Sequence, residues 1–333
     1  MSALSFIKKV WERILKSFVL KIFKVLAAIV IILVLIELGL RLYGHILVRA
    51  QAPDTNRPNV INADYLIACF GDSYTKGTGA SSPNFSYPAQ LERILNHKYG
   101  GVKIAVLNEA IGGLNSSELI QHMEQRLSAY RRPPDLVIVT IFNNNTWNLH
   151  LCSALLEGYA SLPSSKQWIE KLESLRIGKL GVIINERGRE LSDRLVNIDD
   201  NEWFFALKGD MAKGPKRFNP ILNPRIPEER AFLEKWIEHD IAKIQEIVKS
   251  RNSHTLFAAY HNSAVNDIVT ASASPISVPF CEAPKKGALW FVMGWTSKDL
   301  WHLNDRGYAK FAELIADCME SKGFVPKKAN APN

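Results

Sequence analysis

The sequence predicts an α/β protein: a three-layer α/β/α sandwich with a central parallel sheet, preceded by an N-terminal transmembrane helix. Three observations support this prediction. Short, almost wholly apolar runs alternate with longer amphipathic segments, as expected for parallel strands that are covered on both faces. The chain has 333 residues, 47% of them hydrophobic, which is enough for one large core domain. Residues 25–36 form an unbroken apolar run near the N-terminus.

Residues 1–50 are typical of a basic segment followed by a membrane anchor. They hold eight Lys and Arg residues and two acidic residues, which leaves 33 basic and 31 acidic residues beyond them. The stretch from Phe18 to Leu40 is long enough for a bilayer, which needs about 20 residues. Basic residues crowd its N-terminal side, so that end is expected in the cytoplasm. Because the excess positive charge belongs to this segment, we expect membrane association and no nucleic-acid binding.

This pattern predicts a single-pass protein of the inner (cytoplasmic) membrane, with its folded domain on the extracytoplasmic, periplasmic side. A secreted protein, released by signal cleavage near Ala50-Gln51-Ala52, is the alternative. Two prolines among polar residues predict a linker at 51–62. The folded domain is expected at 63–325, and a short tail at 326–333.

Within this domain, strands are predicted at 65–70, 102–107, 134–142 and 255–260, with Ala288–Met293 as a candidate fifth strand. Helices are predicted at 87–99, 117–130, 228–251 and 305–322. The alternation of the two element types predicts the parallel sheet. A long insertion at 146–227, rich in Trp and Phe, is expected to be a small cap or a lid.

Gly71-Asp72-Ser73 follows the first predicted strand and precedes a loop of small residues. In open α/β sheets, ligands bind at the carboxyl ends of the strands, which is where this serine is expected. Near the other end of the chain, Asp299 precedes His302 by three residues, at the start of a predicted helix. A serine nucleophile needs a base, and the base needs a carboxylate to orient it. The alternative is an ordinary turn and a helix-entry histidine.

Two further segments carry groups suited to binding an oxyanion. Gly112-Gly113 follows the second predicted strand and offers backbone N–H groups, although an ordinary turn and helix cap would use the same residues. Asn143-Asn144-Asn145 follows the third predicted strand. An asparagine amide at a strand end is a suitable oxyanion donor, and losing such a donor costs a serine hydrolase roughly a hundred- to a thousandfold in rate.

These four blocks, in this order, resemble the SGNH/GDSL hydrolase superfamily, in the form of a membrane-anchored bacterial protein. The resemblance implies a flavodoxin-like SGNH fold and a Ser73-His302-Asp299 triad. It also implies an oxyanion hole made by Ser73, Gly113 and Asn144. Hydrolysis of acyl esters is then expected, on O-acyl groups of envelope carbohydrate or lipid, without a cofactor or metal. A polysaccharide O-acetyltransferase with the same triad and a noncatalytic glycan-binding or scaffold protein are the alternatives.

The third block departs from the family's usual Gly-x-Asn-Asp, because it begins with Phe142 and has Asn145 in place of the aspartate. We expect Phe142, Asn145 and Trp147 to contact the substrate. Four cysteines allow three complete pairings. Cys69 and Cys318 lie in a predicted strand and helix and are expected to be buried thiols. A Cys152–Cys281 disulfide is a hypothesis, since both follow predicted strands.

Overall fold

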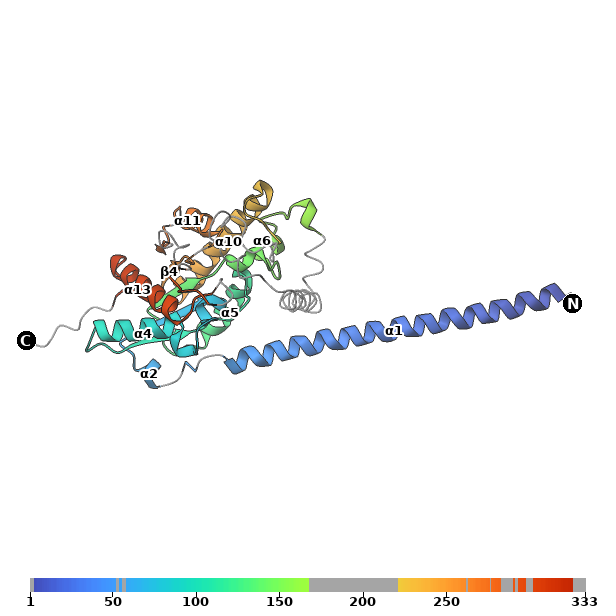
Figure 1. Ribbon diagram of the computed structural model, residues 1–333, viewed down its shortest axis with the longest axis horizontal. Helices are drawn as coiled ribbons and strands as arrows, with labels where there is room; N and C mark the ends of the chain where they lie inside the picture. Colours follow the sequence, from blue (N-terminus) through green and yellow to red (C-terminus); the bar gives the residue numbers. More distant parts are fainter. Residues whose placement is uncertain are drawn as a thin grey trace, which may run out of the picture. The chain divides into compact units, whose positions relative to one another are not determined.

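The computed structural model describes residues 3–51, 54–55, 58–167, 221–261, 263–275, 277–282, 290, 293–297 and 302–325. Five parallel strands form one sheet in the order β2-β1-β3-β4-β5. Helices surround this sheet (Figure 1). The strands are β1 (Tyr65–Gly71), β2 (Ile104–Asn108), β3 (Leu136–Thr140), β4 (His254–Ala258) and β5 (Phe280–Cys281). This is the order of flavodoxin-like sheets, so the predicted fold class is confirmed.

Helices cover both faces of the sheet. They include α4 (Tyr87–Lys98) and α13 (Asp305–Ser321) on one face, and α5 (Ser116–Ser128), α10 (Pro227–Ser250) and α11 (Asn266–Ala273) on the other. Alternate residues of β1 enter two separate hydrophobic clusters, Ile67 and Cys69 under α4 and α13, Leu66 and Ala68 under α5 and α10. Because each strand is buried on both faces, its residues are apolar without alternation.

Short helical segments complete the described part of the domain. They are α2 (Pro58–Ile61), α3 (Ser73–Lys76), α6 (Ser153–Leu156) and three 3₁₀ turns, η1 (Pro83–Phe85), η2 (Asn143–Thr146) and η3 (Ser164–Lys166). The fifth strand of the described sheet is Phe280–Cys281, which was not predicted, and most of the predicted Ala288–Met293 lies outside the described residues. Two residues are too few to give a strand pattern in the sequence. Of the expected insertion, residues 168–220 also lie outside the described part.

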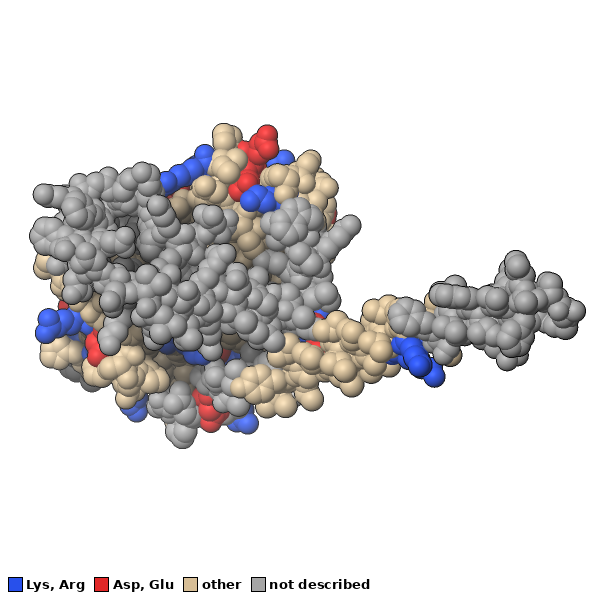
Figure 2. Space-filling view, turned by 45° about the vertical axis from the view of Figure 1, so that its right-hand side comes forward, with Lys and Arg blue, Asp and Glu red and all other residues tan. Residues whose placement is uncertain are grey.

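Helix α1 (Ala3–Gln51) belongs to a separate unit of the chain, residues 1–51 and 172–209, whereas the sheet belongs to residues 52–171 and 210–333. Its segment Val19–Tyr43 is 25 residues long and apolar enough to cross a membrane, as a membrane anchor or as a signal sequence. At about 1.5 Å per residue it exceeds the roughly 30 Å thickness of the hydrocarbon layer. The described side chains of this segment are mostly apolar and exposed. Most of them are drawn in tan, the colour of residues other than Lys, Arg, Asp and Glu, in Figure 2. Glu37 accepts a hydrogen bond from Arg41 Nε at 2.7 Å, one helical turn away.

The cysteines pair differently from our hypothesis. Cys281 in β5 forms a disulfide with Cys318 in α13, while Cys69 and Cys152 are buried and are not in a disulfide. The expected Cys152–Cys281 disulfide is therefore wrong, and so is the free thiol expected at Cys318. The physical reason is the sheet itself: Cys152 packs in the hydrophobic cluster on one face, and Cys281 packs in the cluster on the opposite face.

Candidate active site

Ser73 is the first residue of α3 and follows the end of β1 by two positions. Asp72 caps α3, because its Oδ1 accepts a hydrogen bond at 2.9 Å from the backbone N–H two residues later. A methyl group at Gly71 would lie 2.2 Å from Thr75 Oγ1 and 2.4 Å from a backbone oxygen of β3. Only glycine therefore allows this tight turn. The turn places Ser73 at the carboxyl edge of the sheet, beside the point where the strand order reverses.

His302 lies in a loop that hydrogen bonds to nearby residues of the same chain hold in place. The backbone N–H of Ser297 donates to the His302 carbonyl at 2.8 Å, and Leu303 pairs with Thr296 in an antiparallel bridge. Asn304 then caps α13, and its Nδ2 donates to the Thr296 carbonyl at 3.0 Å. These contacts fix the backbone from which the imidazole projects.

The structure brings the two predicted residues together: His302 Nε2 lies 2.8 Å from Ser73 Oγ. The surrounding loops also contact each other, since Ser81 donates to the Asp305 carboxylate through its backbone N–H at 2.7 Å and its hydroxyl at 2.6 Å. A distance of 2.8 Å is within the range for proton transfer between a nucleophile and its base. Asp299, the expected orienting acid, lies outside the described residues.

The glycine pair after β2 lies beside Ser73. The backbone N–H of Ile111 donates to the Gly71 carbonyl at 3.1 Å, so this segment continues next to the end of β1. A methyl group at Gly112 would lie 3.7 Å from Ser73 Cβ. Gly113 follows with a φ of +83°, a conformation that glycine adopts without strain. Gly112 is therefore close to the serine, and Gly113 follows it directly.

Asn144 lies in η2, between the two segments described above. Its Nδ2 donates to Asp72 Oδ2 at 3.0 Å and to the Leu114 carbonyl at 3.0 Å. The amide thus contacts the residue before Ser73 and the residue after Gly113. These contacts place it where three strand ends meet.

The three side chains expected to contact the substrate differ in their exposure. Phe142 is 1% exposed, has a φ of +97° and stacks on Phe257 with ring centroids 6.1 Å apart. Asn145 is fully buried, and its Oδ1 accepts from the Ser116 backbone N–H at 3.0 Å. Both are enclosed by protein, and the expectation that they contact substrate stays a prediction. Trp147 is partly exposed, and its contact with substrate stays a prediction.

Sequence reasoning missed two buried partners of the site. Tyr260, just beyond β4, donates its hydroxyl proton to Asp72 Oδ2 at 2.7 Å. Burial raises the pKa of the Asp72 carboxyl to about 6, while the hydrogen bonds it accepts and the nearby charge of His302 oppose this rise. The motif that contains Asp72 is visible in the sequence. A short motif cannot predict a hydrogen-bond partner that lies 188 residues further along the chain.

His261 is the second residue that sequence reasoning missed. It is 6% exposed, its Nδ1 lies 3.3 Å from the Tyr74 hydroxyl, and its ring stacks on Trp290. Burial, together with the charge of His302, lowers the pKa of His261 to about 4. At neutral pH the ring is therefore uncharged, and it stacks on Tyr74 as well as on Trp290. Among the described residues, no cluster of three or more His, Cys, Asp or Glu side chains is arranged to hold a metal ion.

Similar solved structures include TesA (13% identity, 77% of this chain and 98% of that chain covered, TM-score 0.45). They also include a two-domain esterase (CEX) described as active on acetylated mannans, with 14% identity, 81% and 52% coverage and a TM-score of 0.44. A third is the lipase/acylhydrolase from Enterococcus faecalis, with 14% identity, 80% and 100% coverage and a TM-score of 0.42. The chain thus spans about half the length of the two-domain esterase.

No curated protein sequence matches the chain significantly. A family model, however, matches the part that holds Ser73, the glycine pair and Asn144, which are three of the four blocks found in the sequence. Residues 69–162 match the model of the GDSL-like lipase/acylhydrolase family.

Proposed function

We propose that this protein is a membrane-anchored serine esterase that hydrolyses acyl esters. The observation that carries the proposal is the 2.8 Å distance between Ser73 Oγ and His302 Nε2, across 229 residues of chain. A serine in an ordinary turn has no need of an imidazole at hydrogen-bond distance, whereas a nucleophile requires one. The family match of residues 69–162 gives independent support for ester chemistry.

In the proposed reaction, Ser73 Oγ attacks the ester carbonyl while His302 Nε2 takes the serine proton. Asp299 orients the imidazole and stabilises its charged form. The backbone N–H groups of Ser73 and Gly113 and the amide of Asn144 stabilise the oxyanion. The C–O bond to the alcohol then breaks as His302 returns the proton to the leaving oxygen. Water attacks the acyl-enzyme by the same route and releases the carboxylic acid.

The substrate we propose is an O-acyl group on an envelope carbohydrate or lipid. The support is topological. Six of the eight Lys and Arg residues of α1 precede its unbroken apolar run at 25–36, which favours a cytoplasmic N-terminus and an extracytoplasmic domain. The Cys281–Cys318 disulfide is suited to the same oxidising side. Protease treatment of spheroplasts should digest the folded domain and leave a short membrane-bound fragment. Protection of the domain, or a soluble protein that begins after Ala52, would contradict the anchored arrangement.

The reaction is tested with a fluorophosphonate probe, which labels activated serines. The full-length chain in detergent should be labelled, and Ser73→Ala should abolish labelling and hydrolysis of p-nitrophenyl acetate. Ser128→Ala, which changes an exposed serine of α5, should behave as the wild type. His302→Ala should slow both readouts by about a thousandfold or more. Equal labelling of the wild type and Ser73→Ala would refute the proposed nucleophile. Acetyl transfer to an added oligosaccharide, in place of acetate release, would favour the O-acetyltransferase alternative.

A further inference from the structure

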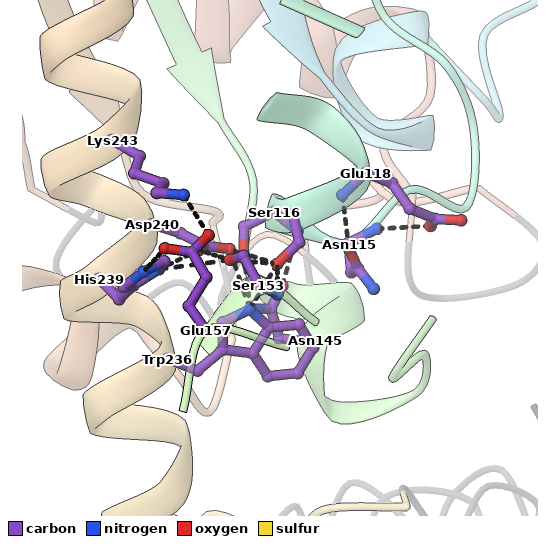
Figure 3. Close-up of polar contacts among 11 residues, drawn as sticks. Asn115, Ser116, Glu118, Asn145, Ser153, Glu157, Trp236, His239, Asp240 and Lys243 are labelled. Atoms are coloured by element: carbon purple, nitrogen blue, oxygen red, sulfur yellow. Dashed lines mark hydrogen bonds and ion pairs between the residues drawn. The ribbon is translucent and has the colours of Figure 1, made fainter. Parts of the chain in front are cut away.

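A fully buried carboxylate on α10 gathers polar groups from three separate segments of the chain (Figure 3). Asp240 Oδ2 accepts hydrogen bonds from Ser116 Oγ at 2.5 Å, Ser117 Oγ at 2.7 Å and Trp236 Nε1 at 2.9 Å. The other oxygen, Oδ1, accepts a hydrogen bond from Ser153 Oγ and lies 2.9 Å from His239 Nδ1. Ser116 and Ser117 begin α5, so the carboxylate lies at the positive end of that helix. This polar cluster joins α10 and α6 to the start of α5.

The cluster is not a second catalytic centre, although it contains a serine, a histidine and acids. Ser153 Oγ donates its proton to Asp240, and His239 Nδ1 faces the same carboxylate. The hydrogen bond to Asp240 is also the main cause that raises the pKa of His239, ahead of the contact with Glu157. A ring nitrogen that holds its proton toward a carboxylate cannot accept the proton of Ser153. The cluster therefore acts by holding segments in place.

One member of the cluster is connected to the active site. Ser116 donates its hydroxyl proton to Asp240, and the same oxygen accepts from Asn145 Nδ2 at 2.7 Å. The Ser116 backbone N–H donates to Asn145 Oδ1 at 3.0 Å, so both ends of this amide are fixed. Asn145 is the immediate neighbour of Asn144 in η2. Ser117 also contacts Asp240, but its other side-chain contacts among the described residues are with Ser153 and Trp236 and not with Asn145.

We infer that Asp240 and Ser116 are positioning residues of the oxyanion hole, acting through Asn145 on Asn144. The inference rests on the proposed function. Asp240 fixes the direction of the Ser116 hydroxyl, Ser116 fixes the Asn145 amide, and Asn145 fixes the η2 backbone that carries Asn144. A donor displaced by a fraction of an ångström stabilises the oxyanion less, although the substrate still binds. The effect therefore falls on kcat and leaves KM nearly unchanged.

Ser116→Ala and Ser117→Ala form a matched pair for the test, because each removes one buried hydroxyl from the same carboxylate oxygen. The full-length chain in detergent is assayed with p-nitrophenyl acetate, and each variant is also unfolded thermally. We expect similar losses of thermal stability in the two variants. We expect kcat to fall about 10- to 100-fold in Ser116→Ala, with KM within about twofold. In Ser117→Ala, kcat should stay within about twofold of the wild type.

Equal kcat values in the two serine variants would overturn the inference, whether both fall or neither falls. Asp240→Asn is the second variant, and it should slow kcat at least as much as Ser116→Ala. If it does not fold, the serine pair still decides. The rate of fluorophosphonate labelling of Ser73 gives an independent readout and should follow kcat. A wild type that neither hydrolyses nor labels would refute the proposed function, and the inference would fail with it. An active wild type with an unaffected Ser116→Ala would refute the inference alone.

Discussion

Replacing His261 by phenylalanine should reduce the loss of stability that the protein suffers in acid. The ring is 6% exposed, and burial with the nearby charge of His302 lowers its pKa to about 4 from the usual 6.5. Above pH 6.5 the residue is neutral in both the folded and the unfolded chain. Below that pH the unfolded chain binds a proton that the folded protein does not, so the unfolded state gains stability until about pH 4.

The magnitude follows from the two pKa values. A pKa of about 4 against 6.5 corresponds to a full loss of about 3 kcal/mol, at 1.36 kcal/mol per pH unit. Between pH 8 and pH 5 the expected loss from His261 is about 2 kcal/mol. Phenylalanine keeps an aromatic ring to stack on Trp290 but does not bind a proton. The His261→Phe variant should therefore lose about 2 kcal/mol less than the wild type over this range.

The assay is urea unfolding at pH 8 and pH 5, followed by tryptophan fluorescence. The control is His254→Phe, which makes the same change at an exposed position at the start of β4. That variant should keep the pH dependence of the wild type. Asp72 contributes an opposite trend, because its raised pKa of about 6 makes the folded state bind its proton first as the pH falls. This contribution is common to all three proteins and cancels in the comparison. An unchanged pH dependence in His261→Phe would refute the reasoning.

Three further changes test the packing around the site. Gly71→Ala should lower the free energy of unfolding by about 1–3 kcal/mol, because the new methyl group would lie 2.4 Å from a backbone oxygen of β3. The control Gly100→Ala has open space around the new methyl group and should change this free energy by less than about 0.5 kcal/mol. Equal effects of the two changes in thermal unfolding would contradict this prediction. Glu109→Gln should lower the free energy of unfolding by about 3 kcal/mol, because the buried carboxylate accepts two hydrogen bonds from Arg126. A loss under about 1 kcal/mol in urea unfolding would contradict a stabilising role for this ion pair. Cys318→Ser should lower the free energy of unfolding by about 3–4 kcal/mol, because it opens a disulfide-closed loop of 37 residues. The denatured wild type should show two reactive thiols before reduction and four after it, and four before reduction would exclude the disulfide.

Local pattern was sufficient to predict most of the fold. The four predicted strands and the four long helices of the domain are all present, with boundaries shifted by a few residues. Buried parallel strands are continuously apolar, and helices repeat their apolar residues along one face, so each element carries its own signal. The two-residue β5 carries no such signal, and it was not predicted.

The principal site residues also came from the sequence, because Ser73 and His302 stand in short motifs with characteristic neighbours. The structure places their side chains in contact, but their catalytic roles stay a proposal, as do those of Gly113, Asn144 and Asp299. The enclosure of Phe142 and Asn145 was not predictable, since it depends on how the chain turns after β3.

By itself, the sequence determined the order of strands and helices, the apolar segment near the N-terminus and the motifs that follow the strands. Only the tertiary structure decided which cysteines pair, that Tyr260 contacts Asp72, and that Asp240 holds the start of α5. The physical reason is distance along the chain: a helix or strand is specified by neighbours a few residues apart. A buried hydrogen bond or disulfide between distant segments depends on which faces the packed sheet and helices bring together.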